Sequence, residues 1–205
     1  MQIKGLPEAA IHRQTQRKQR QPPTGTGTIV FTDVEGSTEK WEVFPTGMAR
    51  AIALHDKLLR ASCHAHYGYE ITTEGDAFML AFYEPEDALS WALEIQRKLL
   101  FEVDWPPALL DDEVRDARGT LLFRGLRVRV GMATGALSPF FDDVTKKTMY
   151  SGDAYDRARS ISDLPSGGQV IMDADTFAAA SLQLCNDGSG QTPRLVDEGV
   201  FHLVG

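Results

Sequence analysis

Two aspartates stand at positions from which they could act on the same ligand. Asp33 ends a β-prone run that begins at Thr26, and Asp76 lies in a Glu-Gly-Asp turn that predicts a tight hairpin. If the first strand lies antiparallel beside this hairpin, both carboxylates reach the same end of the sheet. Two adjacent anions repel unless one is protonated or a cation lies between them, and hard oxygen ligands favour Mg²⁺ or Mn²⁺. The pair therefore predicts a divalent metal site with Asp33 and Asp76 as ligands.

The residues directly after Asp33 predict a phosphate-binding loop. They are Val34, Glu35, Gly36, Ser37 and Thr38, and they place amides and hydroxyls at the start of a short helix, where an anion is stabilised. Metal ions together with phosphates indicate a nucleotide. A pair of cations about 3.5–4 Å apart would activate an attacking oxygen and stabilise the leaving oxygen at one phosphorus.

Each of these residues also has a plain structural interpretation. An aspartate in a turn is ordinarily solvated, and a Gly-Ser-Thr triplet is ordinarily a turn followed by a helix cap, here Ser37 or Thr38. The phosphate role therefore depends on the metal role. Arg127 and Arg129 are interpreted in the same way, as the solvated or edge face of their strand.

The elements that must position these residues alternate in type along the chain. Strands are predicted at residues 26–33, 69–73, 77–82 and 126–134, with a helix from Pro45 to Gly68 and another after Pro85. The order β, α, β, β, α, β predicts an α+β fold, a ferredoxin-like βαββαβ sandwich. Additional C-terminal elements are predicted as a helix at 151–162, a strand at 169–172, a helix at 173–180 and a last strand or hairpin at 194–203. Residues 102–124 are predicted to be an insertion or long surface loop with one helical turn.

Composition limits the class of protein. The 205-residue chain is 42% hydrophobic and 24% charged, which predicts one globular domain and excludes a disordered protein. No run approaches the roughly 20 apolar residues that a membrane helix needs, so we expect a soluble fragment without membrane contact. Cys63 and Cys185 have no Cys-X-X-Cys partner. Neither a disulfide nor a thiolate metal site is therefore predicted, and a reducing, cytoplasmic compartment is expected.

Charge is distributed unevenly along the chain. Residues 1–23 contain five Lys/Arg and one Glu, which leaves 16 basic and 28 acidic residues, a net charge of −12, for the remainder. An acidic body of this kind argues against a nucleic-acid partner. Pro/Gly punctuation follows the basic stretch, so we predict a linker or tail over residues 1–23 and a domain over residues 24–205, with the boundary near Thr24.

Four segments resemble, in order and spacing, the catalytic domain of class III nucleotide cyclases. They are FTDVEGST, YEITTEGDAFML, GLRVRVGMATG, and MYSGDAYDRARSIS followed by SGGQVIM. The resemblance covers about residues 26–203 and is closest to the receptor-type adenylyl cyclases of protists, which also carry a long insert before a GLRVRVG strand. It implies the class III cyclase fold and an enzyme of intracellular signalling. The implied reaction is attack of the ribose 3′-oxygen of ATP on the α-phosphate, giving 3′,5′-cyclic AMP and pyrophosphate.

The resemblance also implies roles for individual residues. Asp33 and Asp76 match the two metal-binding aspartates, and the carbonyl of Val34 is a further ligand for two Mg²⁺ or Mn²⁺ ions. In this family the site forms between two head-to-tail domains, one of which supplies the purine pocket and the transition-state groups. At those positions this chain departs from the pattern. The purine-selecting positions are Thr72 and Met149, the transition-state Asn position is Asp156, the Arg position is Ser160 with Arg159 one place early, and the phosphate-binding Lys aligns with Val204.

A chain that keeps the metal ligands and lacks the complementary groups is typical of the metal-donating half of a heterodimeric cyclase. We therefore expect an adenylyl cyclase half that works with a second cyclase domain, as a heterodimer rather than a homodimer. Arg159 would permit a weak homodimer if its helix shifts by one residue. The fragment is expected in the cytoplasm, alone or as the cytosolic domain of a longer membrane-anchored protein.

Three alternatives remain open at this point. The preference for ATP over GTP rests on the resemblance alone, so a guanylyl cyclase half is one alternative. An inactive pseudocyclase that dimerises with a partner and regulates it is another, suggested by Thr72, Met149, Asp156 and Ser160. A cyclic-dinucleotide synthase shares the βαββαβ plan with paired acids, but Glu74-Gly75-Asp76 lacks the GGDEF-like turn of that family.

Overall fold

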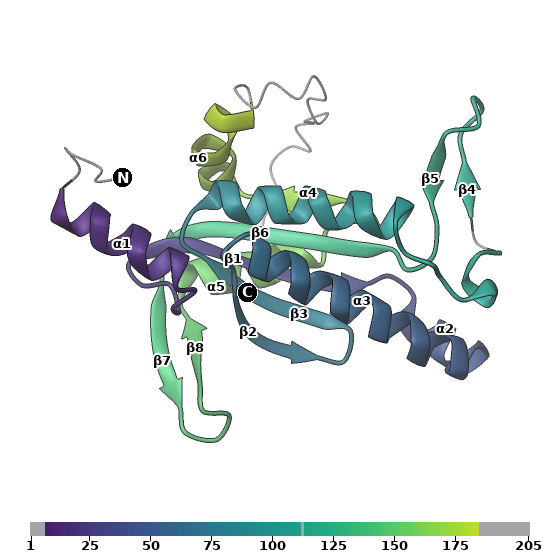
Figure 1. Ribbon diagram of the computed structural model, residues 1–205, viewed down its shortest axis with the longest axis horizontal. Helices are drawn as coiled ribbons and strands as arrows, with labels where there is room; N and C mark the ends of the chain where they lie inside the picture. The colour runs from purple at the N-terminus through teal and green to yellow at the C-terminus, as the bar shows by residue number, and fades with distance from the viewer. Residues whose placement is uncertain (1–6, 112, 185–205) are drawn as a thin grey trace.

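A five-stranded sheet forms the centre of the molecule (Figure 1). The structure is a computed structural model, and it describes residues 7–111 and 113–184. The strands lie in the order β2-β3-β1-β6-β9. Their bounds are β1 Thr26–Val34, β2 Tyr69–Glu74, β3 Ala77–Phe82, β6 Val128–Ala136 and β9 Val170–Met172. β1 is antiparallel to both of its neighbours, and β9 runs parallel to β6.

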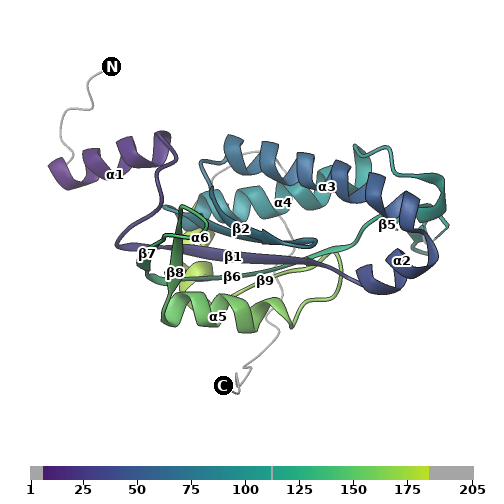
Figure 2. The same cartoon turned by 90° about the horizontal axis from the view of Figure 1, so that it is seen from below.

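Helices cover both faces of this sheet. α3 (Pro45–Ala65) and α4 (Pro85–Phe101) lie on one face and α5 (Asp153–Ser162) on the other (Figure 2). A short helix, α2 (Ser37–Val43), precedes α3, and α6 (Ala174–Leu184) packs against α4 and β6. The predicted α+β sandwich of βαββαβ order is confirmed. The α5 helix comes so close to β6 that a Cβ on Gly131 would lie 2.5 Å from the Ser162 backbone.

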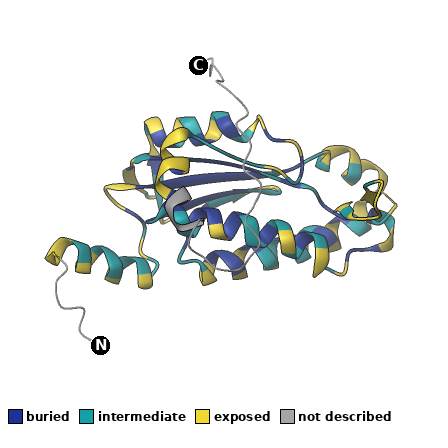
Figure 3. Ribbon diagram, turned by 90° about the horizontal axis from the view of Figure 1, so that it is seen from above, coloured by how far each residue is buried: buried dark blue, intermediate teal, exposed yellow. Residues whose placement is uncertain are grey.

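Buried residues gather along the central strands and on the helices that cover them (Figure 3), and strand alternation divides them between the two faces of the sheet. On β1, Val30 and Val34 point into the core under α3 and α4, whereas Ile29 and Phe31 point into the core under α5. Because side chains alternate with period two, Asp33 belongs to the α5 face. Arg129 lies directly opposite Asp33 in the β1–β6 ladder. The end of the central strand therefore carries an acid and a base side by side.

Residues 8–18 form a helix, α1 (Glu8–Lys18), where the sequence predicts a linker or tail. None of its residues is buried, so no apolar periodicity marked it. The helix is held by charge instead. Arg17 makes hydrogen bonds of 2.5 and 2.6 Å to both carboxylate oxygens of Asp87, and Arg13 pairs with Glu84 at 2.9 Å. The domain boundary near Thr24 stays a prediction.

The insert contains more structure than predicted. Its expected single helical turn is the 3₁₀ turn Pro107–Leu109, and Trp105 and Leu109 are buried against the main core. A small hairpin of β4 (Val114–Arg115) and β5 (Leu121–Phe123) follows. This hairpin projects beyond the end of α4 (Figure 1).

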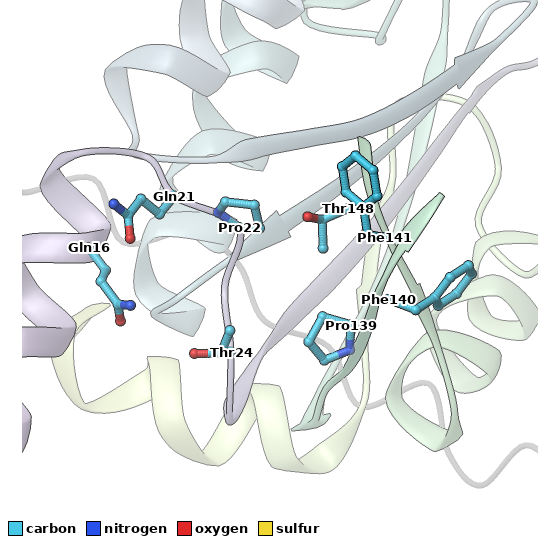
Figure 4. A pocket seen from close by; sticks show the side chains of 8 residues that line it. All are labelled: Gln16, Gln21, Pro22, Thr24, Pro139, Phe140, Phe141 and Thr148. Carbon is cyan, nitrogen blue, oxygen red and sulfur yellow. The ribbon is translucent and has the colours of Figure 1, made fainter. Parts of the chain in front are cut away.

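A second hairpin, β7 (Ser138–Asp142) with β8 (Lys147–Ser151), was not predicted. It leaves the sheet and extends away from the body (Figure 1), so Phe140, Phe141 and Val144 are exposed. A cavity of about 370 Å³ lies between the base of this hairpin and the segment after α1. Figure 4 shows Gln21, Pro22 and Thr24 on one side of it and Pro139, Phe140 and Phe141 on the other. The predicted strand at 194–203, Cys185 and Val204 lie outside the described residues.

Candidate active site

The sheet register brings the two predicted metal ligands to one end of the sheet. Phe31 lies opposite Met79 in the β1–β3 ladder, so Asp33 is level with Ala77, the residue that follows Asp76. The backbone amide of Phe78 donates a hydrogen bond to Oγ1 of Thr32 at 3.1 Å, which ties the ends of the two strands together. Asp33 and Asp76 therefore lie at the same end of the sheet, and their joint role as metal ligands stays a prediction.

Asp33 has a strong partner that the sequence interpretation missed. Arg129 donates to its Oδ2 from both Nε, at 2.9 Å, and Nη2, at 2.5 Å. Both side chains are about one third exposed. Arg129 is therefore a cation of the site, not a solvated strand residue. The only sequence signal was the alternation of GLRVRVG, and it identifies no partner until the register of β6 against β1 is known.

Asp76 provides an orphaned oxygen. Its Oδ2 is buried and has no hydrogen-bond partner among the described residues. A buried carboxylate oxygen without a donor is costly, and a bound cation removes the cost. Residues 7–111 and 113–184 contain no cluster of three or more His, Cys, Asp or Glu side chains that could hold a metal. Two carboxylates at one sheet end are a donor set that suits Mg²⁺ or Mn²⁺, which are commonly bound by one or two carboxylates, water and substrate phosphates.

The loop after Asp33 adopts a turn before α2. Gly36 has φ +65 and stands at the helix N-cap, and no side chain caps the helix. The expectation that Ser37 or Thr38 caps it is therefore wrong, because a left-handed glycine starts the helix instead. Ser37 is half-buried and Thr38 is exposed. Glu35 does not face this turn, because its Oε1 accepts a hydrogen bond of 3.2 Å from the Gly167 amide.

The residues expected in the complementary half lie on other elements. Thr72 is on β2 beside a register shift, and Met149 is on β8, where it packs with the core under α5. Asp156 and Arg159 are exposed on α5. Across the described part of the chain, no hydrogen bond or ion pair joins these residues to Asp33 or Asp76. The two sets do not form one site within this chain.

The residues around Asp156 are otherwise structural. Ser160 donates its hydroxyl to the Asp156 carbonyl at 2.9 Å, and Arg157 donates to the Thr134 carbonyl at 2.7 Å and to Asp173. Arg157 thus holds α5 against β6 and the start of α6. Arg159, the other arginine of α5, is exposed.

Comparison with known proteins identifies relatives. The family model described as the adenylate and guanylate cyclase catalytic domain matches residues 20–190. An adenylate cyclase of Lachancea kluyveri is 41% identical over 158 residues, which cover 75% of this chain and 8% of that protein. The receptor-type adenylate cyclase GRESAG 4.3 of Trypanosoma brucei brucei is 34% identical over 180 residues, 78% of this chain and 15% of that protein.

A solved structure agrees with these matches. An adenylate cyclase from Trypanosoma brucei, determined in its monomeric state, superposes with a TM-score of 0.69 at 33% identity, covering 81% of this chain and 78% of that one. The chain spans only 8% and 15% of the length of the two curated relatives.

Proposed function

The chain belongs to the family of adenylate and guanylate cyclase catalytic domains and is a nucleotide cyclase domain, and from this we propose its reaction. We propose that it converts ATP to 3′,5′-cyclic AMP and pyrophosphate, as the metal-donating half of a dimeric site. The observation that carries this proposal is the position of Asp33 and Asp76 at one sheet end, with Oδ2 of Asp76 buried and without a partner among the described residues. The preference for ATP is supported by the names of the relatives, which are adenylate cyclases.

Asp33, Asp76 and the carbonyl of Val34 would hold two Mg²⁺ or Mn²⁺ ions. When bound, such ions activate the ribose 3′-oxygen and stabilise charge on the α-phosphate and the leaving pyrophosphate. The amides of Gly36, Ser37 and Thr38 would bind the phosphate chain. Glu35 would serve the loop rather than the nucleotide, because its carboxylate is already held by the Gly167 amide.

Arg129 has two possible partners in this scheme. In the structure its guanidinium neutralises Asp33, so it competes with a cation for the same Oδ2. Once that carboxylate is shared, the guanidinium can turn to the phosphate oxygens, whose geometry it matches. When no nucleotide is bound, the guanidinium thus offsets the repulsion between the carboxylates of Asp33 and Asp76. When nucleotide is bound, it balances the charge of the phosphates.

The complementary half must come from a second cyclase domain. Asp156 would place an anion where negative charge develops, and Ser160 supplies no cation there. Loss of a preorganised donor typically costs about 10²–10³ in rate, so we propose a heterodimer in preference to a homodimer. The apolar side chains of Phe140, Phe141 and Val144 on the projecting β7–β8 hairpin offer a surface for such a partner.

Two alternatives differ in their requirements. A pseudocyclase is favoured by the exposed Asp156 and would bind a partner without turnover. A guanylyl cyclase half would differ only in the nucleotide it accepts. Among the described residues, the structure contains no helix both long and apolar enough to cross a bilayer. Because the relatives include a receptor-type adenylate cyclase, we propose that this domain is the cytosolic part of a longer protein.

The decisive experiment is a cyclase assay with ATP and GTP in the presence of Mn²⁺, on this chain alone and mixed with a domain that carries the Lys, Asp, Asn and Arg missing here. We expect cyclic AMP from the mixture and little from the chain alone. Asp33→Ala and Asp76→Ala should abolish the activity of the mixture, and Asp116→Ala, in the insert, serves as the matched control. A mixture that stays silent with both nucleotides while the dimer forms would favour the pseudocyclase.

A further inference from the structure

We propose that Arg127, held in place by Phe123 of the insert, is a positioning residue for the end of β1, which carries Asp33 and Val34. Arg127 acts through Glu35 and touches no substrate. This inference rests on the proposed function, because it assumes that Asp33 and Val34 bind the metal ions. It gives the insert a role in the active site and moves Glu35 from the nucleotide contacts to the support of the loop.

Glu35 is held by contacts from β6 and from the loop before β9. Its backbone amide donates to the Arg127 carbonyl at 2.9 Å, which continues the β1–β6 ladder one residue beyond Val34. Its Oε1 accepts from the Gly167 amide at 3.2 Å, and its Oε2 lies 3.8 Å from Nη1 of Arg127. Backbone and side chain of Glu35 are therefore both held by elements outside the loop.

The contact is closely packed. A Cβ on Gly167 would lie 2.5 Å from Cβ of Arg127 and 2.7 Å from Oε2 of Glu35, so only glycine fits between the two side chains. The next residue, Gly168, has φ +87 and donates its amide to the Val128 carbonyl at 2.9 Å. The loop before β9 thus fills the space beside Glu35 and Arg127.

Arg127 is itself held by the insert. Its guanidinium carbon lies 4.7 Å from the centre of the Phe123 ring, a cation–π contact from β5. A Cβ on Gly168 would lie 2.9 Å from Cε1 of the same ring, so Phe123 also packs against the loop before β9. The chain of contact runs from Phe123 to Arg127, then to Glu35, and from there to Val34 and Asp33 along the backbone.

The contacts of Glu35 keep the end of β1 and the turn after it in place. The carbonyl of Val34 and the carboxylate of Asp33 stand one and two residues before Glu35, and the turn at Gly36 follows it. With Glu35 held, the ligands are already placed before a cation arrives, and binding need not order the end of β1 and the turn that follows it. With Arg127 or Phe123 removed, part of the binding free energy would be spent on that ordering, which weakens cation binding.

The test is Mn²⁺ binding to this chain, measured by electron paramagnetic resonance, for Arg127→Met and Phe123→Ala. We expect Arg127→Met to raise the Kd for Mn²⁺ about tenfold, the lower end of what losing a group behind a metal ligand costs, and Phe123→Ala to raise it less. Arg115→Met is the matched control for the charge change, because Arg115 lies in the same insert and pairs only with Glu113 and the Gly119 carbonyl in the described contacts. Leu122→Ala, an exposed neighbour on β5, is the control for Phe123. Both controls should bind Mn²⁺ as the wild type does.

A second measurement separates positioning from stability. Glu35→Gln keeps an acceptor for the Gly167 amide and should retain most of the affinity, whereas Glu35→Ala should match Arg127→Met. The double variant with Arg127→Met and Glu35→Ala should be no weaker than the worse single variant, because both changes break the same connection. Thermal unfolding is recorded for each variant. If Arg127→Met does not fold, Phe123→Leu, which conserves volume and removes the ring face, takes its place.

The positioning role of Arg127 and the metal site at Asp33 can fail separately. If Asp33→Ala loses Mn²⁺ binding while Arg127→Met and Phe123→Ala bind as the wild type does, the positioning role is wrong and the metal site stands. Additive losses in the double variant would likewise overturn the connection through Glu35. If Asp33→Ala binds Mn²⁺ unchanged, the proposed function itself fails.

Discussion

Arg129 donates two hydrogen bonds, of 2.9 and 2.5 Å, to Oδ2 of Asp33 across the ladder that joins β1 to β6. The pair is partly exposed, so it is worth no more than about 1 kcal/mol to stability. Its importance lies in competition, because the oxygen that Arg129 holds is the one that the proposed metal ion would bind.

Replacing Arg129 should therefore separate cation binding from turnover. Arg129→Met frees Asp33, and Mn²⁺ should bind up to about fivefold more tightly without nucleotide, the equivalent of about 1 kcal/mol. Turnover with the complementing domain should fall about 10²-fold, because a donor for the phosphates is lost. Mn²⁺ titration and the cyclase assay measure the two effects, with Arg118→Met as the control. Weaker Mn²⁺ binding would contradict the competition.

Most substitutions lower stability, but Asp76→Asn should leave the stability of the metal-free protein unchanged or raise it. Without metal, the change removes the charge from a carboxylate whose Oδ2 is buried with no donor among the described residues, so the melting temperature should stay level or rise. Wild-type protein should gain stability when Mn²⁺ is added, because the ion binds the folded state, and the variant should not. Thermal denaturation with and without Mn²⁺ tests both statements. An equal gain in the two proteins would remove Asp76 from the metal site.

The docking of α1 should depend on Arg17 and on salt. Arg17 donates to both oxygens of Asp87 and lies 4.2 Å from the centre of the Tyr67 ring. Arg17→Gln should speed amide exchange in Glu8–Lys18 about tenfold, as should 0.5 M salt in the wild type, because about 1–2 kcal/mol of charged contact is lost. Lys18→Gln, an exposed change of the same charge on the same helix, is the control. Equal exchange in both variants would contradict docking by charge.

Acid should weaken the contact between α3 and α4 in a defined range. Burial raises the pKa of Glu94, but hydrogen bonds from Lys98 and His66 outweigh it and lower the pKa from 4.5 to about 2. A lowered pKa in the folded state means stability that is present above pH 4.5 and is lost as the pH falls toward 2. Glu94→Gln should cost about 1 kcal/mol of unfolding free energy at pH 6, and the difference from wild type should vanish near pH 2. Urea unfolding across this range measures it, and Glu86→Gln on the same helix should show no such trend.

Sequence pattern recovered the elements that depend on local periodicity. The apolar run before Asp33 and the hairpin around Asp76 are short-range signals, and antiparallel pairing then brings the acids together without further information. Arg129 was missed because its partner stands 96 positions away, and only the register of β6 identifies it. Glu35 was assigned to the nucleotide because nothing near it in the chain indicates Gly167.

The missed elements share a physical reason. α1 buries no residue, and β7 is exposed along most of its length, so neither carries the alternation that a core imposes. Their stabilising contacts are charges at α4 for the one and a single strand partner for the other. The residues of the complementary half cannot be placed against Asp33 from one chain, because their neighbours belong to another molecule in the proposed dimer.

Because the side chains of Arg13 and Arg17 fasten α1 to the body, a pull on residue 7 meets these contacts before it meets the backbone ladders of β1. Tension transmitted from the N-terminal side would peel the helix away first and leave the strand that ends in Asp33 in register.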